Sequence, residues 1–270
     1  MRTESCFKGK KMDRTYRFVP ETGSTNDDLK EKLYQSDAPL YQVLAAGRQT
    51  GGRGRQGRAF YSPEGGVYFS VSFPLPRNCP HPAFLTLLSG LAVQKTLQKR
   101  AKTPILIKWP NDIVTGGKKL CGVLTELITA PFGPVAVVGV GLNVRFDEKD
   151  LPEDLRKTAA DLFSLGIGNI DREALIREIV DSLDTFVYRE RALEQPAFPY
   201  RAEYEKALSL TGRTVTRTLG EKSVTGTVKG IDDLGRLVLL TPGGTVKIDS
   251  GIVEEAPEPR SLNSFRNTIY

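Results

Sequence analysis

A glycine- and arginine-rich segment, GRQTGGRGRQGR at residues 47–58, has the composition of an anion-binding loop. It contains five glycines and four arginines, and no Asp or Glu occurs between Ala38 and Pro63. Glycines let backbone N–H groups approach phosphate oxygens closely, and arginines add charge-assisted hydrogen bonds. The residue order is not that of a P-loop. The composition predicts either a loop that cradles a phosphate or a solvated, RGG-like contact to RNA.

A second group of polar residues lies further along the chain, where predicted strands end. KWPND at residues 108–112 closes one strand, and Lys119 begins the next within GGKKLCGVLTE at residues 116–126. A lysine between two strand ends can neutralise charge on a reacting carboxylate or phosphate. GVGLN at residues 139–143 contributes two more glycines and an amide, although a lone G-x-G also fits close packing within a sheet.

Other catalytic chemistries have little support in the sequence. The single histidine, His81, lies between two prolines, which makes a poor general base for serine or cysteine catalysis. The three cysteines, Cys6, Cys79 and Cys121, are far apart and have no C-x-x-C spacing. A disulfide framework and a zinc site are therefore not expected, and we interpret all three as free thiols.

The elements that must position these residues follow from hydrophobic periodicity. Ser24 or Thr25 is placed to cap a helix with an acidic first turn. Further helices are predicted at residues 84–97, 171–191 and 198–210. Strands are predicted at residues 43–46, 67–73, 105–109, 120–128 and 135–144. We expect the last three to be central strands, separated by turns in NDIVTGGKK and TAPFGP.

The pattern changes at Gly212, after which short strands alternate with turns. TVTRTL, SVTGTVKGI, RLVLL and TVKIDSG are divided by LGEK, DDLG and TPGG, a pattern typical of a small closed barrel. We therefore expect a flexible tail at residues 1–15, a first domain at 16–210, a second at 211–256 and a C-terminal tail at 257–270. Met12 is an alternative start to Met1.

Composition places the chain among ordinary globular proteins. Its 270 residues are 39% hydrophobic and 26% charged, which leaves room for one or two domains with full cores. The net charge of +6 can attract a phosphorylated ligand, a nucleic acid or an acidic protein. No run has the length of a membrane span, and the N-terminus lacks the apolar core of a signal peptide. We therefore expect a cytoplasmic protein with no membrane partner.

Taken together and in order, these segments resemble the biotin protein ligases, which adenylate biotin and pass it to a lysine of a carrier protein. The resemblance covers STN at 24–26, GRGRQGR at 52–58, VYFS at 67–70, KWPND at 108–112, KKLCG at 118–122 with Glu126 behind it, and GVGLN at 139–143. It continues into the C-terminal region through GTVKGIDDLGRLVLL. The resemblance implies an α+β fold: a mixed-sheet catalytic domain of the class II synthetase and biotin ligase type, followed by an SH3-like β-barrel.

The resemblance also assigns roles to residues. For biotin binding it implies Ser24, Thr25, Asn26, Gln49, Gly52, Arg53, Lys119 and Gly122. For ATP and the adenylate it implies Arg55, Arg58, Phe60, Lys108, Asn111, Asp112 and Asn143. Lys119, Arg53 and Arg55 are the expected catalytic residues, with Lys119 carrying the charge stabilisation. Phe60 departs from the family, whose bacterial members commonly have tryptophan at this position; phenylalanine offers a smaller face for stacking on adenine.

The chemistry implied by the resemblance needs no enzyme nucleophile. The biotin carboxylate attacks the α-phosphate of ATP, pyrophosphate leaves, and an acceptor lysine then opens the mixed anhydride. Biotin and ATP are the expected substrates, and Mg²⁺ is implied by ATP, with Asp112 as its candidate ligand. The expected partner is the biotin carboxyl carrier protein of acetyl-CoA carboxylase or a related carboxylase.

Two alternatives and two questions about partners accompany this interpretation. A lipoate ligase or octanoyltransferase has the same architecture, but is not expected to contain both KWPND and GRGRQGR. A non-catalytic nucleic-acid-binding module is the other alternative, although residues 212–251 contain no Phe, Tyr or Trp.

Only 23 residues precede Ser24, too few for a helix-turn-helix module of about 60 residues, so no DNA partner is expected. Pairing of two copies through an open sheet edge, giving a homodimer, stays open.

Overall fold

The computed structural model describes residues 13–147, 149 and 151–256. This part of the chain divides into two units, each with its own sheet. The first contains the described residues through Ser209 together with Asp233–Gly235, and the second contains Leu210–Asp232 and the described residues from Arg236 onward. The expectations for Cys6, for Met12 and for the tail at 257–270 lie outside the described residues, as does most of the tail at 1–15.

The first unit is built on a seven-stranded mixed sheet in the order β1-β2-β3-β7-β6-β5-β4. β1 runs parallel to β2, and every other neighbouring pair is antiparallel. The strands are β1 (Thr15–Thr22), β2 (Gln42–Gln49), β3 (Val67–Pro74), β4 (Leu106–Lys108), β5 (Asp112–Thr115), β6 (Lys118–Ala130) and β7 (Gly133–Leu142). This confirms a mixed sheet as the framework of the first unit.

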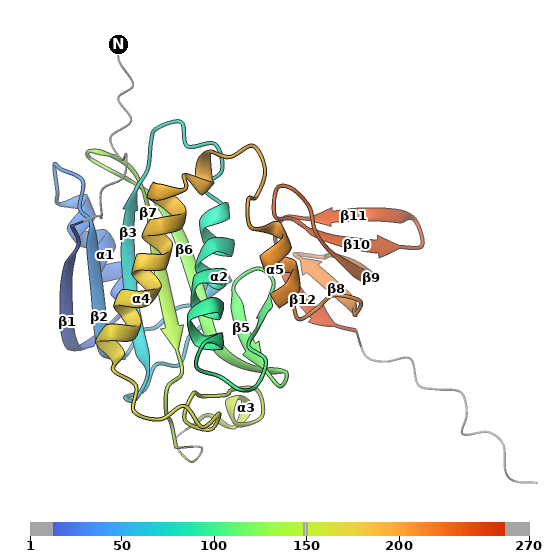
Figure 1. Cartoon of the computed structure of the whole chain (residues 1–270), viewed down its shortest axis with the longest axis horizontal. Helices are drawn as coiled ribbons and strands as arrows, with labels where there is room; N and C mark the ends of the chain where they lie inside the picture. The colour runs from blue at the N-terminus through green and yellow to red at the C-terminus, as the bar shows by residue number, and fades with distance from the viewer. Residues whose placement is uncertain (1–12, 148, 150, 257–270) are drawn as a thin grey trace, which may run out of the picture. The chain divides into compact units, whose positions relative to one another are not determined.

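Helices cover both faces of this sheet (Figure 1). The longer ones are α1 (Thr25–Tyr34), α2 (Phe84–Gln98), α4 (Arg172–Asp184) and α5 (Arg201–Ala207). Short helical segments are η1 (Arg55–Gly57), α3 (Glu153–Arg156), η3 (Thr185–Arg189) and η4 (Ala192–Glu194). α1 lies on one face, and α2 and α4 lie side by side on the other. β3, between them, is buried along its whole length although its sequence alternates aromatic and small residues.

Helix α1 forms where the sequence predicts a helix start. The Ser24 hydroxyl accepts a hydrogen bond from the Asp27 backbone N–H, and Asp27 and Asp28 lie at the positive end of the helix dipole. Leu29 and Leu33 face the sheet and join a cluster with strand residues of β6 and β7. The cap and this apolar stripe fix the N-terminus of α1 over the sheet.

Three strand predictions need correction. Residues 112–115 were expected to be part of a turn, but they form β5 because their backbone pairs with β4 and β6 at once. The strand at 105–109 was expected to be central, whereas β4 is an edge strand and contains only Leu106–Lys108. β1 was not predicted: its pattern of exposed residues lacks an apolar signal, and its pairing with β2 supplies the order instead.

The C-terminal helices of the first unit are shorter than the periodicity predicts. The helix expected at 171–191 ends as α4 at Asp184 and continues as one π-helical segment, η3. The helix expected at 198–210 is reduced to α5. None of the helices in the described part of the chain has the length and hydrophobicity that crossing a bilayer requires.

A buried ion pair holds the start of β1 against α4. The Arg14 guanidinium donates to both carboxylate oxygens of Asp184 and, at 2.9 Å, to the Ser72 carbonyl oxygen. Arg14 and Asp184 are 8% and 9% exposed. Burial alone would lower the pKa of Arg14, but the hydrogen bond and charge of Asp184 raise it above its ordinary value. This contact joins residues 170 positions apart in the sequence.

The second unit is an antiparallel sheet in the order β11-β10-β9-β8-β12. Its strands are β8 (Thr214–Leu219), β9 (Lys222–Ile231), β10 (Leu237–Thr241), β11 (Gly244–Ile248) and β12 (Ile252–Glu255). The sequence predicts the first four and not β12. Within the described residues, β11 and β12 are the two edges and no pairing joins them, so the structure describes a sheet and not a closed barrel.

Candidate active site

Three glycines lie next to one another on the face of the sheet that α1 covers, so the sheet itself projects no side chain there. Gly122 of β6 pairs with Gly141 of β7, and Gly139 of β7 pairs with Ser70 of β3. A Cβ atom at Gly141 would lie 2.4 Å from the Phe60 ring, and one at Gly122 would lie 3.1 Å from it. We call Gly122, Gly139 and Gly141 the glycine floor. The ring of Phe60 rests on Gly122 and Gly141, and at Gly141 it is too close for any residue with a Cβ atom.

The Gly-Arg loop (residues 47–58) is folded back on itself. The Gly54 N–H donates to the Arg58 carbonyl oxygen at 2.7 Å, and the Phe60 N–H donates to the Gly52 carbonyl oxygen at 2.8 Å. Gly52 is buried, and a Cβ there would lie 2.5 Å from the Phe60 carbonyl oxygen. Close backbone approach therefore explains this glycine. Arg58 is exposed at the end of the turn.

Lys119 lies at the edge of the glycine floor. Its Nζ is 2.7 Å from Asp112 Oδ1 and 5.6 Å from the centroid of the Phe60 ring. Asp112 Oδ1 is buried and has this ion-pair contact but no hydrogen bond among the described residues. Lys119, Asp112 and Phe60, three residues predicted from separate motifs, thus meet at one place.

The second arginine of GRGRQGR contacts the KWPND motif. Arg55 Nη1 donates to Asn111 Oδ1 at 3.3 Å, and Asn111 Nδ2 donates to the Val123 carbonyl oxygen at 2.7 Å. Partial burial lowers the pKa of Arg55, and the nearby Asp112 carboxylate opposes this effect. The loop and the 108–112 segment are therefore in direct contact.

Two predicted nucleotide-binding residues lie less directly in the site. Asn143 Nδ2 donates to the Ala160 carbonyl oxygen at 2.9 Å and to that of Lys119 at 3.4 Å, so its amide ties three chain segments together. Lys108 lies on the edge strand β4, opposite Asp112 of β5, and is half-buried.

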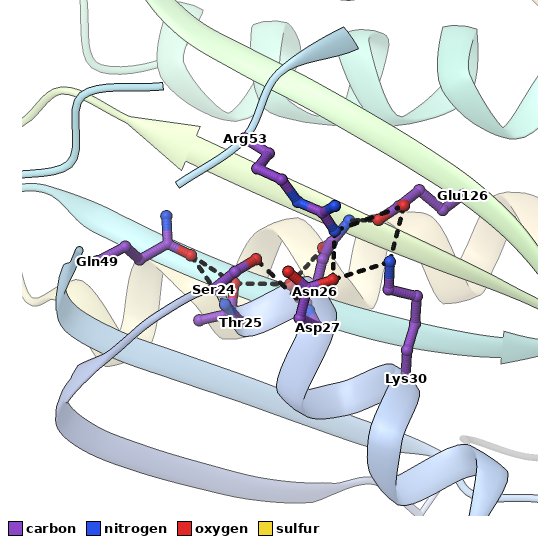
Figure 2. A network of polar contacts seen from close by, with 9 residues as sticks. Ser24, Thr25, Asn26, Asp27, Lys30, Gln49, Arg53 and Glu126 are labelled. Carbon is purple, nitrogen blue, oxygen red and sulfur yellow. Dashed lines mark hydrogen bonds and ion pairs between the residues drawn. The ribbon is translucent and has the colours of Figure 1, made fainter. Parts of the chain in front are cut away.

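The predicted biotin-binding residues at the start of α1 form a polar cluster with Gln49 and Ser70. We call this cluster the polar pocket; it contains Ser24, Thr25, Asn26, Gln49 and Ser70. Gln49 Oε1 accepts from the Thr25 backbone N–H at 2.9 Å and lies 3.1 Å from Thr25 Oγ1 (Figure 2). Gln49 Nε2 donates to Ser62 Oγ at 3.0 Å. The orientation of the Gln49 amide is therefore fixed from both ends.

A group of charged residues lies on one side of this pocket, next to α1 (Figure 2). Glu126 Oε2 accepts from Asn26 Nδ2 at 2.7 Å, and Glu126 Oε1 accepts from Lys30 Nζ at 2.8 Å. The first arginine of the loop, Arg53, pairs with Asp27 and lies 3.8 Å from Glu126 Oε1. The guanidinium of Arg53 therefore lies beside two carboxylates.

Four residues in this region were not predicted as site residues from the sequence: Ser70, which contacts Asn26, and Glu126, Asp27 and Lys30. Ser70 and Glu126 do carry a signal, since each is a polar residue inside an apolar strand sequence. Asp27 and Lys30 read as an ordinary exposed helix face and give no such signal. Among the described residues, no group of three or more His, Cys, Asp or Glu side chains is arranged to hold a metal ion.

Comparison with protein families gives two matches. Residues 18–143 match the biotin/lipoate A/B protein ligase family, and residues 211–254 match the biotin protein ligase C-terminal domain. Together the two matches include every residue of the candidate site and the whole five-stranded sheet except the last residue of β12.

Individual relatives agree with these matches. The chain is 34% identical to biotin--[acetyl-CoA-carboxylase] ligase of Mycobacterium tuberculosis, over 87% of this chain and 86% of that one. It is 35% identical to the bifunctional ligase/repressor BirA of Bacillus subtilis, over 86% of this chain and 71% of that one. The biotin protein ligase of Aquifex aeolicus, solved in complex with biotin and ATP, superposes with a TM-score of 0.74 at 30% identity, over 89% of this chain and 99% of that one. On this identity and coverage, the chain belongs to the biotin protein ligase family.

Proposed function

We propose that this protein activates biotin with ATP to form biotinyl-5′-AMP and transfers the biotin to a lysine of a biotin carboxyl carrier protein. One observation carries the proposal: Lys119, the Gly-Arg loop and the polar pocket converge on the glycine floor. The names of the Mycobacterium tuberculosis and Aquifex aeolicus relatives support the same substrates. The acceptor is the carrier protein of acetyl-CoA carboxylase or a related carboxylase.

The pocket fits the uncharged end of biotin. Thr25, Gln49 and Ser70 offer neutral oxygens held in fixed positions, which suits a urea ring with N–H donors. Ser24 and Asn26 complete this end of the site. Gly52 and Gly122 border it, and Gly52 lets the Gly-Arg loop pack closely against Phe60 and Ser62. Phe60 stacks on adenine, beside Lys108, Asn111 and Asn143.

Activation requires two anions to approach each other, and this is the task of Lys119. Its ammonium neutralises the biotin carboxylate and the α-phosphate as the phosphorus–oxygen bond forms and pyrophosphate leaves. Arg53, Arg55 and Arg58 close over the mixed anhydride and exclude water until the acceptor lysine attacks. No side chain of the protein forms a covalent bond in this scheme.

Asp112 is the candidate ligand for a magnesium ion that enters with ATP. Its buried Oδ1 has no hydrogen-bond donor among the described residues, and one or two carboxylates are enough to hold Mg²⁺ beside substrate phosphates. Lys119 Nζ lies 2.7 Å from the same oxygen, so Asp112 would be shared between the lysine and a bound ion. When bound there, such an ion would shield the negative charge of the phosphates.

Other parts of the sequence interpretation belong to the proposal. We infer that the five-stranded sheet belongs to an SH3-like domain and that the domain limits are 16–210 and 211–256. The proposal includes a cytoplasmic location and no DNA partner, and a homodimer stays open. The matched C-terminal domain at residues 211–254 supports the second limit.

Incubation with ATP and biotin, followed by mass spectrometry of the protein fraction, tests the proposal. Biotinyl-5′-AMP is expected to form and to stay bound, because the loop excludes water from the anhydride. Lipoate serves as the control substrate. An adduct with lipoate in place of biotin would favour the lipoate ligase alternative, and no adduct with either acid would favour the nucleic-acid-binding one.

Arg55→Ala should release biotinyl-adenylate faster than the wild type while leaving the melting temperature almost unchanged. Arg55 lies in the loop and has one 3.3 Å hydrogen bond to Asn111, so its loss opens the site without disturbing the core. Rapid filtration of preformed adenylate measures the release. Wild-type retention, or loss of the folded state, would contradict this role.

A further inference from the structure

Glu126 was not among the expected site residues, yet it contacts both the polar pocket and the charged group beside it (Figure 2). Its two carboxylate oxygens have separate partners: Asn26 Nδ2 at 2.7 Å and Lys30 Nζ at 2.8 Å. Burial alone would lower the pKa of Lys30, but hydrogen bonds to Glu126 and Asp27 raise it. Lys30 and Glu126 thus form an ion pair at the edge of the pocket.

The charge of Glu126 determines how the Asn26 amide is oriented. An ionised carboxylate only accepts hydrogen bonds, so the NH₂ group of Asn26 must face it. The amide oxygen then faces Ser70, with Oδ1 2.5 Å from Ser70 Oγ. A Cβ at Gly139 would lie 2.4 Å from the same oxygen, so this glycine gives the amide its place on the floor.

This orientation leaves the pocket short of one hydrogen. Ser70 Oγ is close to Asn26 Oδ1 and, at 2.7 Å, to Thr25 Oγ1, which in turn is 3.1 Å from Gln49 Oε1. These are three oxygen–oxygen contacts, but only the two hydroxyls carry a proton, because both amide oxygens are acceptors. One contact therefore has no hydrogen between its oxygens.

A reversed Asn26 amide would remove the shortage. Its NH₂ group would donate to Ser70, Ser70 would donate to Thr25, and Thr25 to Gln49, so that every contact would have its hydrogen. The pocket would then be satisfied without a ligand. Gln49 cannot provide the same relief, because its oxygen is held by the Thr25 backbone N–H at 2.9 Å.

We propose that Glu126 is a positioning residue that prevents this reversal and so keeps the pocket selective for a ligand that brings an N–H donor. The proposal rests on the proposed function, in which the donor is a urea N–H of biotin. Glu126 acts through Asn26 and Ser70 and does not itself touch the ligand. Its effect is therefore on selectivity between ligands with and without that N–H.

Glu126→Gln tests the proposal, because the new side-chain amide can accept from Asn26 or donate to it. Calorimetry should compare biotin with the two cyclic carbamate analogues in which a ring oxygen replaces one urea N–H. We expect the variant to bind biotin about tenfold more weakly, the scale of one unsatisfied hydrogen bond, and to bind at least one carbamate almost as the wild type does. The selectivity for biotin over that carbamate falls accordingly.

Moving the carboxylate from position 126 to position 26 keeps the total charge and should restore the selectivity for biotin. Asn26→Asp alone sets two carboxylates side by side and should lose biotin binding and selectivity. In the double variant Asn26→Asp/Glu126→Gln, the glutamine NH₂ donates to the new aspartate, whose other oxygen again faces Ser70. We expect its selectivity to return to within about threefold of the wild-type value. The double variant also tests the proposal if Glu126→Gln alone does not fold.

Glu178→Gln is the matched control. Glu178 lies on α4, and its side chain is 30% exposed against 27% for Glu126. Like Glu126, it has a separate partner for each carboxylate oxygen, here Lys99 and Arg100. It should leave selectivity unchanged. Wild-type selectivity in Glu126→Gln, or no recovery in the double variant beyond Asn26→Asp, would overturn the proposal. A wild-type protein that binds no biotin would instead contradict the proposed function.

Discussion

Lys119→Ala should lower the rate of biotinyl-adenylate formation by about a hundredfold or more while changing biotin affinity far less. The negative charge of the biotin carboxylate and the α-phosphate is most crowded in the transition state, so a cation aimed at that point stabilises it more than the ground state. Single-turnover formation of the adenylate at saturating ATP and biotin measures the effect, and calorimetry gives the biotin affinity separately.

Lys118→Ala is the matched control for this prediction. Lys118 is the neighbouring residue of β6, opposite Thr115 of β5, and its side chain is exposed. Successive side chains of a strand point to opposite faces, so Lys118 points away from the ring of Phe60 that Lys119 approaches. Greater damage in Lys118→Ala, or a wild-type rate in Lys119→Ala, would show that another residue supplies the charge.

Asp184→Ala should lower the free energy of unfolding by about 3–5 kcal/mol, the usual cost of leaving one partner of a buried ion pair unpaired. Arg14 would keep the hydrogen bond to the Ser72 carbonyl oxygen and lose all its hydrogen bonds to the Asp184 carboxylate. Urea unfolding followed by the fluorescence of Trp109, the sole tryptophan and a buried residue of the same unit, measures the change.

Two comparisons show whether the buried charge is the cause. Glu173→Ala removes an exposed pair with Arg177, whose closest atoms are 3.9 Å apart, and should cost less than about 1 kcal/mol. Arg14→Met/Asp184→Leu replaces both charges by apolar groups and should be more stable than Asp184→Ala. An Asp184→Ala midpoint equal to that of Glu173→Ala would mean that the ion pair adds no stability.

Local sequence was sufficient for the elements whose signals lie within a few residues. The cap at Ser24, the apolar spacing of α2 and the β-branched runs of β6 and β7 predict their elements, because caps and periodicity act over one or two turns or along a single strand. The order of the motifs likewise predicted the family. β5 has only four residues, and it is a strand because two neighbours supply its hydrogen bonds.

Residue types predicted the chemistry of the site, and the tertiary structure decided its connections. Lys119 and the Gly-Arg loop indicated a site for an anion, and the resemblance to the biotin protein ligases added Gln49 as a partner of the urea ring. It could not indicate that Glu126 meets Asn26, 100 positions away, or that Phe60 rests on Gly141. These contacts depend on the pairing register of β6 with β7, which sets the face on which each side chain lies; a shift of one residue would move Glu126 to the opposite face of the sheet.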